Sequence, residues 1–277
     1  MKLFPYTSTL AAMVGVSLAS AAHAALVFEA TPGNTTNFSN NNNGTTAANI
    51  SLTGTASDLL LASSGGNFFA GGFGSSDDIN TLNGSTLTDL DTVTISLTID
   101  SVSDTGSSEL RSRGIQFGIA SGVALDSGIA SPTSLIIGLG GGGNSGPVDL
   151  IQGTGGANST EVSPAFTIAP TSVADGFGVT LTADTNGYTF SYTGLTASSG
   201  TLADVTGTFA PGEFVSNFGD GHFYILTQKR NSSNANPGTT TLDISEASIS
   251  IETIPEPSSV ALVGLSGLAL LSRRRRA

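Results

Sequence analysis

The chain of 277 residues contains no cysteine, no tryptophan and only two histidines. Without cysteine, disulfide bonds, thiolate catalysis and cysteine-ligated zinc are excluded. His23 lies within a predicted leader segment, so only His222 remains to serve a Ser-His-Asp triad, and a zinc site built on several histidines is excluded. The glycine-rich segment Gly219-Asp220-Gly221 directly precedes His222. We therefore expect this histidine to cap a loop.

Basic residues are also scarce. Of the 9 Lys and Arg residues, only Arg111, Arg113, Lys229 and Arg230 lie between residues 25 and 254. All but one of the 21 Asp and Glu residues lie there, so the net charge of this body is near −16, compared with −12 for the whole chain. Such an acidic surface argues against nucleic acid and anionic membranes as partners. It is compatible with solubility outside the cell and with binding of divalent cations.

Sustained helical periodicity is absent, and alternation of period two takes its place. Residues 90–102 put Val93, Ile95, Leu97 and Ile99 on one side and Thr and Ser residues on the other. This alternation is typical of a half-buried strand. Further strands are predicted at residues 49–61, 114–120, 134–139, 148–151, 223–227 and 242–251.

A hairpin is the most specific local prediction. Residues 177–193 contain two strands around Asp184-Thr185-Asn186-Gly187, a turn sequence that favours a two-residue hairpin loop. Ten or more short strands with Gly and Asn turns predict an all-β fold, an antiparallel β-sandwich. A right-handed β-helix is the alternative, and it ranks lower because the chain has no repeat of fixed period. The polar segment 31–46 is predicted to be a mobile loop.

Three pairs of carboxylates are candidates for a Ca²⁺ site, because this ion prefers oxygen ligands. They are Asp77 with Asp78, Asp89 with Asp91, and Asp100 with Asp104. Asp89 and Asp91 stand two residues apart at a predicted strand start, which would point both to the same face. None of the pairs fits the EF-hand pattern. We interpret them as solubilising turn residues and assign neither a metal ligand nor a cofactor.

The sequence also lacks the residue patterns that are typical of enzymes acting on polysaccharides. A glycoside hydrolase needs two carboxylates that face each other, about 5–9.5 Å apart. Glu109, Glu161 and Glu213 are isolated in the sequence. Sugar-binding sites often use aromatic platforms, and the body has three tyrosines and no tryptophan. We predict no catalytic residues and expect a non-enzymatic protein. A lectin-like carbohydrate-binding module, with or without dependence on Ca²⁺, is the alternative, and a glycoside hydrolase is a more distant one.

The first 24 residues have the order of a secretory signal peptide. Lys2 supplies the positive charge, residues 10–22 are mostly small and apolar, and Ala22-His23-Ala24 forms an A-x-A cleavage site. Cleavage there would make Ala25 the mature N-terminus. We therefore predict export through the inner membrane.

The last 23 residues form a tail of three consecutive parts. Pro255-Glu256-Pro257 opens it, residues 258–272 carry no charge, and Arg273, Arg274, Arg275 and Arg276 close it. A helix of 15 residues spans about 22 Å, short of the roughly 30 Å of a bilayer core. Arginine side chains can snorkel and a bilayer can thin, so a short span is tolerated. We predict a short C-terminal transmembrane helix with the arginines as its cytoplasmic stop-transfer cluster.

The order of these three parts resembles the PEP-CTERM sorting domain of Gram-negative bacteria. The resemblance covers Pro255, Glu256 and Pro257, the apolar run 260–271 and the arginines 273–276. It implies that an exosortase, a membrane-embedded cysteine transpeptidase or protease, recognises the tail and removes or exchanges it. It also implies transient anchoring in the inner membrane and delivery to the cell surface or to the extracellular polysaccharide matrix.

The body resembles, at the level of the fold alone, the concanavalin A or laminin-G type of jelly roll. The predicted organisation is therefore a signal peptide at residues 1–24, a β-sandwich body at 25–254 and a sorting tail at 255–277. The predicted partners are an exosortase, the inner membrane before processing and extracellular polysaccharide.

Overall fold

The computed structural model describes residues 24–30, 38–41, 50–54, 59–64, 68–104, 109–121, 133–139, 148–154, 159–162, 166–230 and 239–254. The chain divides into two compact units, and all described residues belong to the unit His23–Ile254. The predicted signal peptide and the predicted tail helix lie outside the described residues. Within these residues, no helix is both long and apolar enough to cross a membrane.

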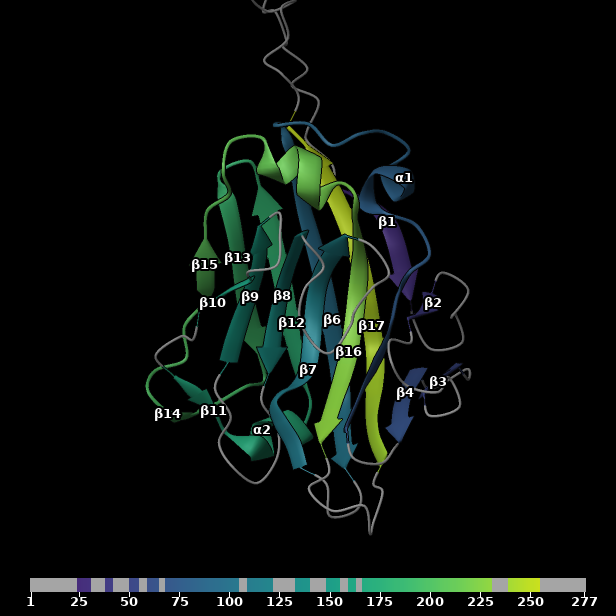
Figure 1. Ribbon diagram of the computed structural model, residues 1–277, viewed down its shortest axis with the longest axis vertical. Helices are drawn as coiled ribbons and strands as arrows, with labels where there is room; N and C mark the ends of the chain where they lie inside the picture. Colours follow the sequence, from purple (N-terminus) through teal and green to yellow (C-terminus); the bar gives the residue numbers. More distant parts are fainter. Residues whose placement is uncertain are drawn as a thin grey trace, which may run out of the picture. The chain divides into compact units, whose positions relative to one another are not determined.

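Two antiparallel sheets pack face to face (Figure 1). The first, of eight strands, has the order β15-β13-β12-β6-β17-β4-β3, and β1 pairs with β17 as well. Its strands are β1 (Ala25–Ala30), β3 (Ile50–Gly54), β4 (Leu59–Ser64), β6 (Asp91–Asp104), β12 (Phe177–Asp184), β13 (Gly187–Thr193), β15 (Val205–Gly207) and β17 (Thr239–Thr253).

The second sheet, of seven strands, has the order β10-β9-β8-β7-β16-β5-β2. Its strands are β2 (Phe38–Asn41), β5 (Phe68–Ser75), β7 (Glu109–Ser121), β8 (Thr133–Leu139), β9 (Val148–Thr154), β10 (Ser159–Val162) and β16 (Gly221–Arg230). The short strands β11 (Thr167–Ile168) and β14 (Ala197–Ser199) form a separate pair. The described helical segments are five residues each: α1 (Ile79–Asn83), α2 (Pro170–Ala174) and the π-helical turn η2 (Phe214–Phe218).

The core lies between the two sheets, where the predicted alternation is confirmed. The apolar residues of β6 that were expected on one side, Val93 to Ile99 at every second position, are at most 1% exposed. Aromatic rings connect the layers: Phe117 of β7 lies edge-on to Phe190 of β13, and Phe28 of β1 contacts Phe223 of β16. Such tilted and edge-on ring contacts add to the burial of apolar area that stabilises the sandwich.

The predicted hairpin is also confirmed. β12 ends at Asp184 and β13 begins at Gly187, which leaves Thr185 and Asn186 as the loop. The Asp184 carboxylate accepts hydrogen bonds from the backbone N–H groups of Asn186 (2.7 Å) and Gly187 (3.1 Å). A side chain that satisfies the turn in this way fixes its geometry.

Three local predictions were wrong. Residues 49–61, predicted as a strand, contain β3 and the start of β4, which pair with each other through Leu52 and Leu61. Residues 38–41, inside the segment expected to be a mobile loop, form β2, which pairs with β5 through Phe38 and Ser75. A polar segment can form such an edge strand because its partner supplies the backbone hydrogen bonds. His222 caps no loop: it is the second residue of β16 and pairs with Ala120.

Candidate functional site

The outer side of the eight-stranded sheet presents hydroxyl groups in rows of directly paired residues that run across the strands, and we call each row a rank. One rank runs across five neighbouring strands and consists of Thr206, Thr189, Thr182, Thr94 and Ser250, each paired directly with the next. Directly paired residues of adjacent strands project to the same side of a sheet, about 4.8 Å apart. The alternation that buries one side of these strands therefore places the hydroxyl groups together on the other.

Two further ranks extend this surface. The second runs Ser191, Thr180, Ser96 and Ser248, and the third joins Thr193 to Thr98 through Gly178. We call the combined surface the hydroxyl face. It consists of Thr94, Ser96, Thr98, Thr180, Thr182, Thr189, Ser191, Thr193, Thr206, Ser248 and Ser250. Ser248 is buried at the edge of this face, and its hydroxyl group donates to the Glu246 carboxylate (2.9 Å).

Acidic residues border the hydroxyl face at several margins. Asp184 lies two residues after Thr182 on β12, and Asp100 lies two residues after Thr98 on β6. Glu29 of β1 pairs with Ser248, and Glu246 of β17 pairs with Thr98. Followed through its described pairs, no rank contains a lysine or an arginine. The face is therefore an uncharged array of hydrogen-bond donors and acceptors on a protein that is otherwise strongly acidic.

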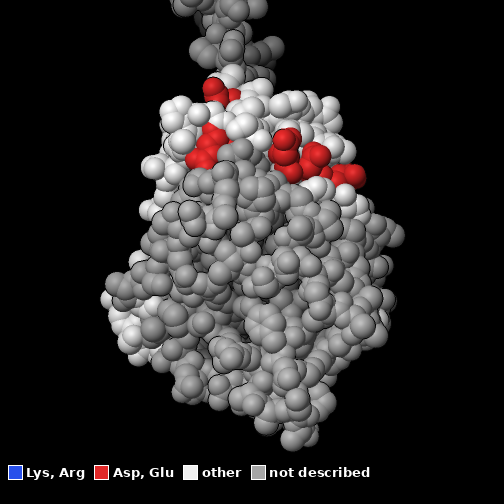
Figure 2. Space-filling view, viewed as in Figure 1, with Lys and Arg blue, Asp and Glu red and all other residues white. Residues whose placement is uncertain are grey.

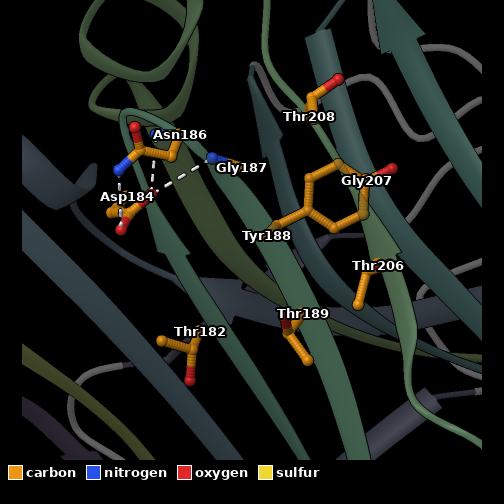
Figure 3. A pocket seen from close by; sticks show the side chains of 9 residues that line it. All are labelled: Thr182, Asp184, Asn186, Gly187, Tyr188, Thr189, Thr206, Gly207 and Thr208. Atoms are coloured by element: carbon orange, nitrogen blue, oxygen red, sulfur yellow. Dashed lines mark hydrogen bonds between the residues drawn. The ribbon is translucent and has the colours of Figure 1, made fainter.

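A hollow of about 620 Å³ lies at the β15 side of the hydroxyl face. Figure 3 shows Thr182, Thr189 and Thr206 side by side on three adjacent strands, with Asp184 and Asn186 of the hairpin turn at the upper end. The Asp184 carboxylate holds the turn, as described above. The groups available to a ligand here are thus mainly hydroxyl and backbone groups.

Tyr188 borders the hollow, and Gly207 makes room for it. The Tyr188 side chain is 5% exposed and opposes Gly207 of β15. A Cβ atom at Gly207 would lie 2.1 Å from the Tyr188 hydroxyl oxygen. Burial, followed by the negative charge of Glu213, raises the pKa of Tyr188 to about 12. At neutral pH this phenol is therefore a neutral hydrogen-bonding group and not a base.

Tyr192 lies on the inner side of the same strand. It packs edge-on against Phe166, with ring centroids 6.4 Å apart. Its hydroxyl group is buried and has no hydrogen-bond partner in the described part of the chain. Burial, followed by the charge of Asp204, raises the pKa of Tyr192 strongly. This phenol is neutral as well.

On the side drawn in Figure 2, the visible Asp and Glu side chains of the described residues lie toward one end of the body. Asp78 and Asp220 contact α1. Asp78 caps α1 by accepting from the Thr81 N–H (2.7 Å). Asp220 accepts from the Asn80 side chain (3.1 Å), and His222 Nδ1 lies 3.1 Å from the Ser75 carbonyl oxygen. In the described ranges, no three His, Cys, Asp or Glu side chains are placed to hold one metal ion.

Asp89 and Asp91 do not act as the pair that their spacing predicts. Asp89 lies in the turn before β6, is exposed, and accepts from the Thr185 hydroxyl (3.3 Å). Asp91 is 4% exposed and accepts from the Thr88 N–H (2.6 Å) and hydroxyl (2.9 Å). Its other oxygen accepts from the Thr253 hydroxyl (2.5 Å). The expectation of a shared face was wrong because strand geometry begins only at Asp91.

Of the predicted processing residues, only Ala24 belongs to the described part of the chain. Ala22, Pro255, Glu256, Pro257 and Arg273 to Arg276 lie outside the described residues, and Ala24 is the exposed residue before β1. Sequence reasoning missed the contact of Asp91 with Thr253. The Thr-x-x-Asp spacing of Thr88 and Asp91 indicates the local hydrogen bonds that Asp91 accepts from Thr88. No local pattern indicates its other partner, which lies 162 residues away in the sequence.

Comparisons with known proteins agree with both resemblances. Residues 253–276 match the family model of the PEP-CTERM protein-sorting motif. No curated protein sequence matches the chain.

Solved structures resemble the body in fold. The seed lectin of Lotus tetragonolobus has a TM-score of 0.52 at 11% identity, over 83% of this chain and 99% of that chain. Arcelin-5, a lectin-like defence protein of Phaseolus vulgaris, has a TM-score of 0.50 at 11% identity, over 82% and 97%. The exoplasmic/lumenal domain of VIP36, bound to Ca²⁺ and Man3GlcNAc, has a TM-score of 0.50 at 12% identity, over 85% and 92%. The fold is thus a lectin-like β-sandwich of the concanavalin A type, as predicted.

Proposed function

We propose that the protein is a non-enzymatic β-sandwich of the cell envelope or extracellular polysaccharide matrix, exported and then sorted through its C-terminal tail by an exosortase. The match of residues 253–276 to the sorting motif carries this proposal. Before processing, the tail anchors the protein in the inner membrane. After processing, the body is released to the cell surface or the matrix.

The chemistry of the described body supports a role without catalysis. The carboxylates of Asp91 and Asp184 hold backbone turns, and the Nδ1 atom of His222 faces a backbone carbonyl. Tyr188 and Tyr192 keep their protons at neutral pH. General acid–base catalysis requires a group that exchanges protons near the working pH, within reach of a substrate. We therefore expect no turnover of matrix polysaccharides by the purified protein.

Expression of the full chain in a Gram-negative host that carries an exosortase tests the proposal. Intact-mass analysis should give a mature N-terminus at Ala25 and a shortened C-terminus. The same host without its exosortase gene should accumulate the form that retains residues 255–277. Identical C-termini in the two hosts would contradict the proposed sorting by an exosortase.

A second function, binding of a neutral polysaccharide, is favoured by the hydroxyl face. An uncharged array of regularly spaced hydroxyl groups can exchange hydrogen bonds with the hydroxyl groups of an extended sugar chain. Among the structures of similar fold, the VIP36 domain holds Man3GlcNAc with Ca²⁺. The hydroxyl face has no aromatic platform. Each sugar unit would therefore bind weakly, and affinity would depend on many units of one chain.

Pull-down of the protein on insoluble neutral polysaccharides tests this second function. The triple variant Thr182→Val/Thr189→Val/Thr206→Val removes three hydroxyl groups beside the hollow and keeps the side-chain shape. It should lose most of the bound fraction, whereas Thr196→Val/Thr201→Val, at exposed loop positions, should bind as the unchanged protein does. Equal binding by the triple variant would exclude the hydroxyl face, and no binding by the unchanged protein would exclude the function.

A further inference from the structure

The last described residues of the body are hydrogen-bonded to the first residue of β6 and to the turn before it. The Thr253 hydroxyl donates to Asp91 Oδ1 (2.5 Å), and the Ile254 N–H donates to the Leu90 carbonyl (3.0 Å). We call Leu90, Asp91, Thr253 and Ile254 the junction clasp. Pro255, the first residue of the tail, follows the clasp directly.

The fixed half of the clasp is Asp91. It is 4% exposed, and its Oδ2 atom accepts from both the N–H and the hydroxyl group of Thr88. These two bonds leave Oδ1 oriented toward Thr253. A hydrogen bond to a buried carboxylate is stronger than one between neutral groups, because one partner carries a full charge.

The end of β17 is held on both of its edges. On one edge, β6 pairs with β17 up to Thr253, which opposes Asp91. On the other edge, β1 pairs with β17, so that Ala25 opposes Ile251. Ala25 is also the predicted first residue after signal-peptide cleavage. The two predicted processing junctions therefore leave the body from neighbouring strands, with no linker between the sheet and the sorting motif.

This arrangement limits access to the motif. A protease or transpeptidase that reads backbone needs its substrate as an extended, unpaired strand on both sides of the bond it attacks. Thr253 and Ile254, the two residues before Pro255, donate hydrogen bonds into the body through the Thr253 hydroxyl group and the Ile254 N–H. An enzyme can engage them only after the clasp opens.

We propose that the junction clasp gates tail processing: Asp91 and Leu90 hold Thr253 and Ile254 in the folded body, and the exosortase acts on the molecules in which this contact is open. The proposal rests on the proposed sorting function. Asp91 and Thr253 are positioning residues in it, because they act through the placement of the tail and not on the bond that is broken.

Pulse–chase labelling of the full chain in an exosortase-carrying host measures the half-life of the precursor. Thr253→Val removes the hydroxyl donor at an exposed position and should speed processing about tenfold or more, the range that the loss of one hydrogen bond to a charged group allows. Thr253→Ser keeps the donor and should process at the original rate. Thr201→Val, an exposed loop threonine, is the matched control and should also process at the original rate.

Two further variants separate the clasp from recognition of the tail sequence. Asp91→Asn lies outside the matched segment 253–276 and should also speed processing. A Gly-Ser-Gly-Ser insertion between Ile254 and Pro255 leaves the clasp intact, adds about 13 Å of reach and should speed processing as well.

The outcomes are distinct. Processing of Thr253→Val at the original rate or slower overturns the gate, and so does an insertion variant that is no faster than the original chain. If the unchanged chain keeps its tail in the host that carries the exosortase, the sorting function itself fails, since no variant can then be compared.

Discussion

The two sides of β6 differ as much as any two regions of this molecule, although they alternate residue by residue. Ile95 and Leu97 are at most 1% exposed in the core, whereas Thr94 and Ser96, their neighbours in sequence, belong to the hydroxyl face. Burial of apolar area stabilises the fold, and an exposed hydroxyl group contributes little to stability. The inner side therefore determines whether the sandwich forms, and the outer side is free to serve binding.

Substitution of neighbouring residues on the two sides gives the largest expected contrast. Ile95→Ala should lower the free energy of unfolding by about 2–5 kcal/mol, because it leaves a cavity at a fully buried position. Thr94→Ala should lower it by less than about 1 kcal/mol. Urea denaturation of both variants measures the difference. Similar losses would show that the hydroxyl face also carries the stability of the sheet.

Substitution of Gly207 tests how tightly the buried Tyr188 side chain packs beside the hollow. Gly207→Ala places a methyl group against the buried Tyr188 ring, and we expect a loss of about 1–3 kcal/mol in the free energy of unfolding. Gly212→Ala is a control without a steric conflict, since no atom lies within 4 Å of its added Cβ, although its positive φ adds some strain. A Gly207 variant as stable as the Gly212 variant would contradict the packing seen here.

Alkaline pH should lower the stability of the folded body, because its core contains buried tyrosines. An unfolded tyrosine loses its proton near pH 10, whereas burial raises the pKa of Tyr188 to about 12 in the folded body. The unfolded state then holds fewer protons, so stability is complete below pH 10 and falls as the pH rises toward 12. Melting temperatures measured across this range should fall less steeply for Tyr188→Phe. The fall should not vanish, because burial raises the pKa of Tyr192 in the same direction.

The smallest expected effect concerns the Tyr192 hydroxyl group. It is buried without a hydrogen-bond partner in the described part of the body, so no hydrogen bond offsets the free-energy cost of its desolvation. Tyr192→Phe should leave stability unchanged or raise it by up to about 1 kcal/mol. A clear loss in thermal or urea denaturation would reveal a contact for this hydroxyl group.

Much of the sandwich could be predicted because its strands have local patterns. The alternation in residues 90–102 indicated β6 and its buried side, and Asp184 to Gly187 indicated the hairpin. β2 was missed because its four residues, FSNN, have no apolar alternation of their own, and its pairing with β5 creates the strand. The candidate site was missed for a related reason, since Thr206 gains its place beside Thr189 only through pairing with β13.

The sequence by itself determined the two-sided character of the strands, the hairpin turn and the sorting motif of the tail. These features depend on residues that are close along the chain, where steric limits, turn chemistry and hydrophobic periodicity act directly. Only the tertiary structure decided which threonines share a rank and which residue holds Thr253. Register between distant strands is set by packing and by the closure of long loops, and no local pattern records it. The contact between Asp91 and Thr253 therefore became visible only in the folded body.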